Sequence, residues 1–389
     1  MNEKHWQRIA IGAGAGMFLG MALGRFSYSA MIPALVDSGN LDAVTAGYIG
    51  GVNMVGFLAG AAASTLAVKC LRLDRVLFAS ILVAVAALAA SALPWGPLWL
   101  GAWRAAIGVA TGCIMVLGLA VTAQSAPPEH RARAMSYIFI GVGSGILFGA
   151  TIVPASLKVS ITTAWLAVSF AGVIAAAIAL WCWRDVASAA SPPGAPREQP
   201  QPRARIAWYA IVVASFLFSF GIVPHTIYWF DYIARGLGHG YAIAGWHWTG
   251  VGIWAILGPV LAAWLARVAG TSFAAAVAYF VMAAGVALPW LTHAGPALVL
   301  SSIIFGAQPG VSTLLGARAR DLGTADEMPA MMRTIILANG IGSAISGITV
   351  PMLLDLTGSY ELLFLSGGIA LACGGILCLP AIARAPSRA

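Results

Sequence analysis

Long apolar runs alternate with short polar stretches along the whole chain, and this pattern predicts the secondary structure. A helix needs about 20 apolar residues to cross the hydrocarbon core of a bilayer. Cutting the sequence at charged residues and at Pro/Gly turns leaves twelve runs of roughly that length, each predicted as a spanning helix. They cover residues 9–36, 44–68, 76–93, 98–123, 134–157, 162–183, 206–232, 241–266, 273–291, 296–316, 329–354 and 360–382.

Composition narrows the class of protein further. Of the 389 residues, 60% are hydrophobic and only 9% are charged, whereas a soluble domain carries about 25% charged residues. The sequence therefore predicts an all-α polytopic membrane protein in contact with the lipid bilayer. It has no P-loop, no ATP-binding domain and no His/Glu pair at metal-binding spacing, so we expect neither an enzyme nor a primary pump, and no metal or cofactor. The five cysteines also lack metal spacing and are expected to be free thiols.

The distribution of Lys and Arg predicts the orientation of the helices. If the N-terminus is cytoplasmic, 16 of the 21 basic residues fall in cytoplasmic segments and two, Lys158 and Arg235, fall in outer loops. Such a bias places both termini in the cytoplasm, and we expect the cytoplasmic membrane of a bacterium. The net charge of +8 is thus explained by topology, and no nucleic-acid partner is expected.

The two halves of the sequence resemble each other, as in transporters built from parallel repeats. Pro154 and Pro351 align at an offset of 197, and Gly60 and Gly258 align at an offset of 198. The Pro/Ala/Ser-rich stretch between the halves has the composition of a flexible linker. We therefore predict an N-terminal six-helix bundle over residues 1–185, a cytoplasmic linker over 186–205 and a C-terminal six-helix bundle over 206–389.

Twelve spans, a duplication of six helices and a basic linker resemble the major facilitator superfamily over the whole chain. The segment Gly24-Arg25-Phe26-Ser27-Tyr28, followed by Ile32-Pro33 and then Ala46-Gly47-Tyr48, is similar to the YbfB/YjiJ-type branch of that superfamily. The resemblance implies a transporter of the major facilitator fold, with helices 1 and 4 around a central cavity. It does not imply a particular substrate.

Two arginines inside predicted spans are the first candidates for substrate binding. A charged side chain within the bilayer is costly and by default marks a functional pathway. Arg25 lies about 24 Å along the first run, and Arg104 about 9 Å below the outer end of the fourth. A guanidinium presents a planar fork of donors to a carboxylate or phosphate. The alternative is that each arginine only caps carbonyls or braces helices. Tyr28, close to Arg25 in sequence, is a further candidate.

The seventh run carries the candidates for proton coupling. Pro224 is expected to break this helix and to open backbone groups to a cavity. His225, Tyr228 and Trp229 follow a spacing that places them on one face, and histidine can exchange protons near neutral pH. Asp231 is a candidate relay, with a surface ion pair to Arg235 as the alternative. A purely structural histidine bonded to a carbonyl is equally compatible with the sequence.

Aromatic and amide side chains complete the candidate pocket. Trp254 and Gln308, the latter at an expected kink before Pro309, are candidate substrate contacts. Trp246 and Trp248 are expected in an interfacial belt, and Asn53 is expected to join helices. Gly141, Gly145 and Gly149 are predicted as a helix-packing face.

These residues favour a secondary active transporter that moves a small organic anion, such as a carboxylate, together with protons by alternating access. In this hypothesis Arg25 and Arg104 bind the anion, His225 carries the proton, and the chain works as a monomer. A proton-coupled exporter of hydrophobic drugs or metabolites and a non-transporting membrane sensor are the alternatives.

Overall fold

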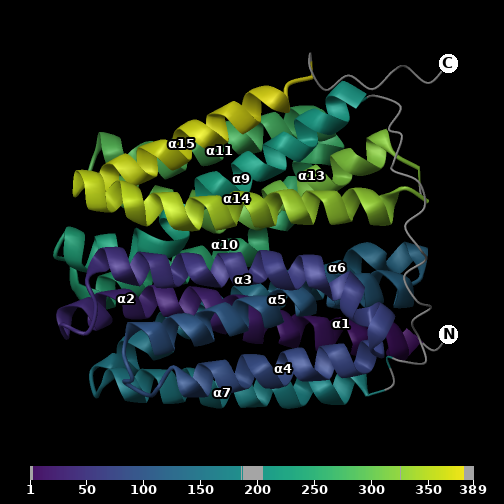
Figure 1. Cartoon of the computed structure of the whole chain (residues 1–389). Helices are drawn as coiled ribbons and strands as arrows, with labels where there is room; N and C mark the ends of the chain where they lie inside the picture. The colour runs from purple at the N-terminus through teal and green to yellow at the C-terminus, as the bar shows by residue number, and fades with distance from the viewer. Residues whose placement is uncertain (1–2, 185, 187–204, 325, 381–389) are drawn as a thin grey trace. The chain divides into compact units, whose positions relative to one another are not determined.

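The computed structural model describes residues 3–184, 186, 205–324 and 326–380 of the chain. Within these ranges the chain is helical and contains no strand. Twelve of the described helices are long and apolar enough to cross a membrane, which confirms the fold class expected from the sequence. Figure 1 shows these helices running side by side within each part of the chain. The predicted linker 186–205 lies outside the described residues except for its two ends.

The first six spans contain eight helical segments, three of which form the first span. They are α1 (Glu3–Met17), η1 (Phe18–Phe26), α2 (Ser27–Asp37), α3 (Ala43–Cys70), α4 (Leu73–Ala90), α5 (Pro97–Ser125), α6 (Arg131–Leu157) and α7 (Ile161–Trp183). A short 3₁₀ turn, η2 (Pro128–His130), precedes α6. The first span is one continuous rod, because η1 is a π-helical stretch between α1 and α2.

The second six spans follow the same plan. They are α9 (Arg205–Asp231), η3 (Tyr232–Gly236), α10 (Gly240–Ala269), α11 (Thr271–Leu291), α12 (Gly295–Gly306), α13 (Gln308–Leu322), α14 (Met328–Thr357) and α15 (Tyr360–Leu377). The tenth span is interrupted at Ala307, where α12 ends and α13 begins. This confirms the kink expected before Pro309. Like η1, η3 is π-helical.

The chain forms two compact units. Unit 1 comprises the described residues of Met1–Pro193 together with Ile227–Ile253, and unit 2 comprises those of Gly194–Thr226 and Trp254–Ala389. Residues 227–253 follow the predicted linker in sequence, yet they pack with the first six spans. Unit 1 therefore contains a segment from the second half of the chain.

Glycines make a close helix contact in unit 1. Gly56 and Gly60 on α3 face Gly108 and Gly112 on α5, and a Cβ atom at any of the four would overlap the backbone of the opposite helix. Small residues at four-residue spacing let two backbones approach in this way. The α3–α5 contact is thus made by backbone against backbone (Figure 1).

The internal repeat recurs in this packing. In unit 2 a Cβ atom at Gly310 would lie 2.7 Å from the carbonyl oxygen of Gly258, and these glycines stand 198 residues after Gly112 and Gly60. The face of α6 formed by Gly141, Gly145 and Gly149 packs against the first span, where added Cβ atoms would meet Gly14, Ala22 and Ser27. The predicted packing role of that face is confirmed.

The predicted break at Pro224 is wrong. Helix α9 continues through Pro224 to Asp231. Proline lacks the N–H that would normally bond the carbonyl four residues earlier, which here belongs to Phe220. The hydroxyl of Ser346 on α14 donates to that oxygen at 2.8 Å. A neighbouring helix therefore satisfies the freed carbonyl, as occurs in membrane proteins.

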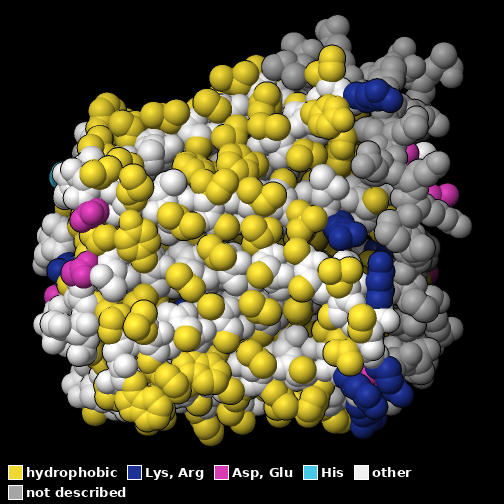
Figure 2. Space-filling view, viewed as in Figure 1, with side chains coloured by type: hydrophobic (Ala, Val, Ile, Leu, Met, Phe, Trp, Pro, Cys, Tyr) yellow, Lys and Arg dark blue, Asp and Glu magenta, His cyan; other side chains and the backbone are white. Residues whose placement is uncertain are grey.

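Hydrophobic side chains cover much of the face seen in Figure 2, and Lys and Arg gather at one end of the helices. Lys69, Arg72 and Arg75, which surround the α3–α4 turn, are exposed. Arg72 pairs with Asp74 at 3.0 Å. An apolar belt with charges at the ends of the helices is the surface expected of a multi-pass membrane protein.

The glycine contact predicts the effect of adding one methyl group. Gly60→Ala should destabilise the protein by about 1–3 kcal/mol, because the Cβ atom overlaps the α5 backbone. Gly250→Ala is the matched control, since its Cβ would meet no described atom within 4 Å, and it should stabilise α10 by up to about 1 kcal/mol. Thermal unfolding of the detergent-purified variants, followed by size-exclusion chromatography, measures both. Equal melting temperatures would refute the close contact.

Candidate substrate-binding site

Arg25 lies in a π-helical part of the first span. The N–H of Ser27 bonds the carbonyl of Ala22, five residues earlier, at the end of η1. Single π-turns inside α-helices occur frequently at functional sites. Gly24, the residue before Arg25, packs close to Ile107 of α5, so the backbone next to Arg25 is held against the fourth span.

The Arg25 side chain is half-buried and is held by neutral partners. Its Nε donates to Oδ1 of Asn53 at 3.2 Å, and its guanidinium carbon lies 5.1 Å from the centre of the Phe57 ring. Its Nη2 is buried and has no hydrogen-bond partner among the described residues. The fork of the guanidinium is therefore left with donors for a further acceptor.

Arg104 is more deeply buried, with 1% of its surface exposed. Its Nη2 donates to the carbonyl of Gly24, and its guanidinium carbon lies 4.7 Å from the centre of the Tyr28 ring. The Nε and Nη1 atoms have no partner among the described residues. Arg104 thus binds the backbone immediately before Arg25, while Tyr28 bonds the carbonyl of Ala46 at 2.8 Å through its hydroxyl.

Asn53 connects the two arginines. Its Nδ2 donates to the backbone carbonyl of Arg104 at 3.0 Å, and its Oδ1 accepts from Arg25. The prediction that Asn53 joins helices is confirmed. Within the described part of the chain, no carboxylate pairs with either Arg25 or Arg104. Amide, carbonyl and aromatic groups surround both cations, and none of them cancels a charge.

His225 lies in unit 2 and is fully buried. Its Nε2 is 3.0 Å from the hydroxyl oxygen of Ser301. Its ring centre lies 5.1 Å from that of Phe305 and 4.6 Å from that of Phe364. The histidine is therefore enclosed by α12 and α15, and the Ser301 hydroxyl is a partner of its Nε2.

The other candidates on this helix lie in unit 1. The Tyr228 hydroxyl donates to the carbonyl of Ala43 at 3.1 Å. The Trp229 ring centre lies 5.8 Å from that of Tyr232. Asp231 pairs with Arg235 at 3.2 Å, as the sequence suggested, but its side chain is 0% exposed. The alternative of a surface ion pair is therefore wrong for Asp231, because the pair is buried.

The remaining candidates differ in burial. Trp254 is half-buried in the unit 2 part of α10. Gln308 is 8% exposed and begins α13. Trp246 is 76% exposed, as expected in a belt. Trp248 is fully buried and packs against Phe26 and Phe230, so its belt assignment is wrong.

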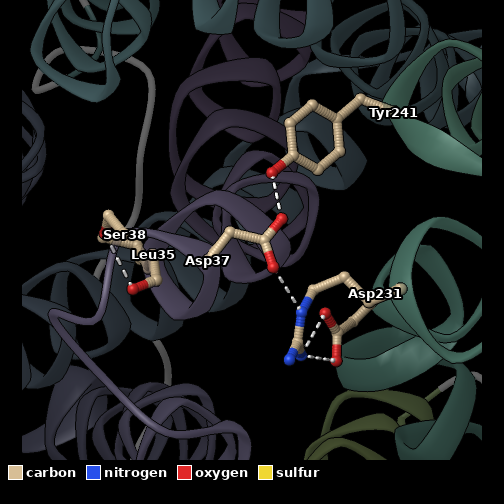
Figure 3. Close-up of polar contacts among 6 residues, drawn as sticks. Leu35, Asp37, Ser38, Asp231 and Tyr241 are labelled. Atoms are coloured by element: carbon tan, nitrogen blue, oxygen red, sulfur yellow. Dashed lines mark hydrogen bonds and ion pairs between the residues drawn. The ribbon is translucent and has the colours of Figure 1, made fainter. Parts of the chain in front are cut away.

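Asp37 and Tyr241 form a polar cluster that the sequence reasoning missed. Arg235 Nε donates to Asp37 Oδ1 at 2.8 Å, and the Tyr241 hydroxyl donates to Asp37 Oδ2. Figure 3 shows the Asp37 carboxylate between the hydroxyl of Tyr241 and the guanidinium group that also contacts Asp231. Asp37 and Arg235 are 198 residues apart in sequence. The sequence offered one indication of this contact, because Asp37 and Arg235 lie at the same predicted end of their helices.

No group of three His, Cys, Asp or Glu side chains in the described ranges could hold a metal ion. Around η1 the polar side chains that meet are Arg25, Arg104 and the amide of Asn53, and groups of this kind can bind and orient a ligand.

Twelve helices that are long and apolar enough to cross a membrane are the architecture of the major facilitator fold, and solved structures share this fold. The chain is similar to the peptide transporter POT in complex with sulfate (TM-score 0.76, 16% identity, covering 97% of this chain and 94% of that one). It is also similar to a D-xylose-proton symporter (TM-score 0.74, 13% identity, 97% of each chain). The human organic anion transporter MFSD10 is a third relative (TM-score 0.69, 15% identity, 97% of this chain and 100% of that one). At such identities the likeness establishes the fold.

The family follows from the sequence. The family described as uncharacterised MFS-type transporter YbfB matches residues 17–379, and the chain belongs to this family. Its members are transporters, not enzymes. No protein with a curated description matches the sequence.

The neutral clamp on Arg25 predicts the effect of adding a charge. Asn53→Asp should form a charge-assisted bond with Arg25 that is worth about 1.5–3 kcal/mol. The substitution loses the neutral bond to the backbone carbonyl of Arg104, which is worth about 0.5–1.5 kcal/mol. The melting temperature of the ligand-free protein should therefore rise. Any stabilisation by small anions should disappear.

Asn53→Ser is the control, because it removes both bonds without adding a charge. It should lower the melting temperature and leave most of the stabilisation by anions. Equal loss of that stabilisation in the two variants would show that the amide acts only through structure.

Proposed function

We propose that this transporter carries a small organic anion, such as a carboxylate, by proton-coupled alternating access. The observation that carries the proposal is the pair Arg25 and Arg104, whose charges meet only neutral partners among the described residues. An arginine with unused donors is suited to a planar anion. The proposal includes cytoplasmic termini, two six-helix bundles and a monomeric protein in a bacterial cytoplasmic membrane.

The two arginines have different parts in this proposal. Arg25 is half-buried and retains a buried donor without a partner, so it contacts the anion. Arg104 is almost fully buried and bonds the carbonyl of Gly24, so it holds the backbone beside Arg25 and adds positive potential. Tyr28 orients Arg104 through its ring. Tyr228, Trp229, Trp254 and Gln308 are proposed to shape the rest of the pocket.

The similar structures give this proposal support of a general kind. They include one POT transporter in complex with sulfate, another in complex with 5-aminolevulinic acid, and an organic anion transporter. Sulfate is an anion, and 5-aminolevulinic acid carries a carboxyl group. A proton symporter with the same fold supports coupling to protons.

Anion binding is tested by substituting Arg25. The purified protein is first screened by thermal shift against acetate, succinate, benzoate and sulfate, with tetraphenylphosphonium, amines and sugars as comparisons. The carboxylate with the largest shift is then used as a radiolabelled probe in proteoliposomes. Arg25→Gln should weaken its binding about 10- to 150-fold, because a charged hydrogen bond is worth about 1.5–3 kcal/mol.

Arg25→Lys should retain part of the affinity, since it keeps the charge and loses the planar fork. Arg333→Gln is the matched control, because Arg333 is an exposed arginine of α14, and it should bind as the wild type does. Unchanged affinity in a well-folded Arg25→Gln protein would refute the anion site. Stabilisation by tetraphenylphosphonium alone would favour a drug exporter, and absence of any exchange would favour a sensor.

His225 is the proposed proton carrier. Arginine does not exchange its proton at physiological pH, whereas histidine is the side chain type that does. His225 lies inside unit 2, where its partner is the hydroxyl of Ser301 and its neighbours are aromatic rings. A hydroxyl can donate to neutral histidine or accept from the protonated form. Asp231, buried beside Arg235, is the proposed relay.

Coupling is tested by His225→Gln, which retains a polar amide toward Ser301. Gradient-driven accumulation of the radiolabelled carboxylate should be lost, while exchange across the membrane, which needs no net proton movement, should persist. Uptake into proteoliposomes with and without an imposed pH gradient measures both. Ser301→Ala is a milder variant that should reduce accumulation without abolishing it. Full gradient-driven accumulation by His225→Gln would exclude the histidine from coupling.

A further inference from the structure

The cluster of Asp37, Asp231, Arg235 and Tyr241 joins two distant parts of the sequence within unit 1. Asp37 is the last residue of α2, while Asp231 ends α9 and Arg235 lies in η3. Tyr241 is near the start of α10. The described contacts of the Asp37 carboxylate are the Nε of Arg235 and the hydroxyl of Tyr241. Every bond of this carboxylate therefore leads to a residue from the second half of the chain.

One guanidinium serves two carboxylates in this cluster. Arg235 Nε lies 2.8 Å from Asp37 Oδ1, and Nη1 lies 3.2 Å from Asp231 Oδ1. The two acids differ in access to water, because the Asp37 side chain is 49% exposed and that of Asp231 is 0% exposed. A proton from solvent therefore reaches Asp37 directly. Arg235 then keeps Asp231 as a charged partner within its own helix.

We propose that Asp37 is a proton-binding site whose protonation releases residues 232–241 from α2, so that this cluster is a pH-dependent latch on the first span. The ionised carboxylate holds Arg235 and Tyr241, and the protonated carboxyl group loses the ion pair with Arg235. The latch is thus closed at higher pH and opens as the pH falls. The inference rests on the proposed transport function, in which residues 227–253 must separate from the first six spans.

The contacts that Tyr228, Trp248 and Ile227 make between these segments are neutral, so they do not impose the same pH dependence. The Tyr228 hydroxyl donates to the Ala43 carbonyl, and Trp248 packs between Phe26 and Phe230. Ile227 lies 3.6 Å from a Cβ built on Gly50 of α3. These contacts stabilise the closed arrangement at every pH. The Asp37–Arg235 ion pair adds further stabilisation, which is lost when Asp37 is protonated.

Other titratable groups on the same elements are accounted for separately. Apart from the cluster itself, those on α2, α9, η3 and α10 are Tyr28, Arg205, Tyr209, His225, Tyr228, Tyr232, His247 and Arg267, and those in turns at helix ends include Asp42, Lys158 and His239. The hydroxyl and the N–H of Thr45 both donate to Asp42 and lower its pKa, so Asp42 stays ionised to a lower pH than an aspartate without these bonds. His239 is exposed and lies between η3 and α10, next to the segment that is measured, so it needs its own control.

Hydrogen–deuterium exchange of the full-length protein, without substrate or gradient, tests the latch. Backbone exchange in residues 232–241, corrected for its intrinsic pH dependence, should be about two- to fivefold faster at acidic than at neutral pH, as expected for one ion pair. Asp37→Asn should exchange at the fast rate at both pH values. Asp231→Asn should retain the response with its midpoint at lower pH, because Arg235 then has Asp37 as its remaining carboxylate in the cluster.

Tyr241→Phe should move the midpoint to higher pH, because the ionised Asp37 loses a donor. This variant provides a mild test if Asp37→Asn folds poorly. Asp355→Asn and His239→Gln should behave as the wild type does, the first being an exposed acid of α14. A pH-independent rate in the wild type, a retained response in Asp37→Asn, or loss of the response in His239→Gln would overturn the latch. A normal response without anion transport would refute only the proposed function.

Discussion

Burial of two guanidinium charges among neutral groups is the constraint around which unit 1 is organised. A buried charge is costly unless hydrogen bonds or an opposite charge replace its hydration. Arg25 and Arg104 are held by an amide oxygen, a backbone carbonyl and two aromatic rings. These partners stabilise the cations in part and leave their charge intact. An anionic ligand would supply the missing compensation, which is why the same arrangement supports binding.

The glycine contact between α3 and α5 makes this arrangement possible. Asn53 lies one turn before Gly56, and its own backbone oxygen lies against Gly108. Because the two backbones approach so closely, the short amide of Asn53 reaches the carbonyl of Arg104 and still accepts from Arg25. Larger side chains on the facing surfaces of α3 and α5 would move the helices apart and leave the Asn53 amide with one partner. The electrostatics of the site thus depend on the close packing of α3 against α5.

Features carried by local chemistry were predictable from the sequence, and features that depend on a distant partner were not. Apolar length predicted the twelve spans, and four-residue spacing predicted the packing face of Gly141, Gly145 and Gly149. The break at Pro224 was wrong because a hydroxyl on another helix bonds the Phe220 carbonyl. The burial of Trp248 depends on Phe26, more than 200 residues away. A single sequence offers no pattern for such pairs.

The contrast between Arg25 and Arg235 shows how charge balance assigns different chemistry to the same residue type. Arg25 has no carboxylate partner among the described residues, so its unused donors favour an anion. Arg235 is bonded to two carboxylates. A proton that binds one of these carboxylates therefore competes with Arg235 for it. Arg25 and Asp37 also lie on the same continuous first span, about 18 Å apart along its axis. The proposed ligand site and the proposed latch therefore share one rod, and a shift of η1 on ligand binding would act directly on the residue that holds the latch.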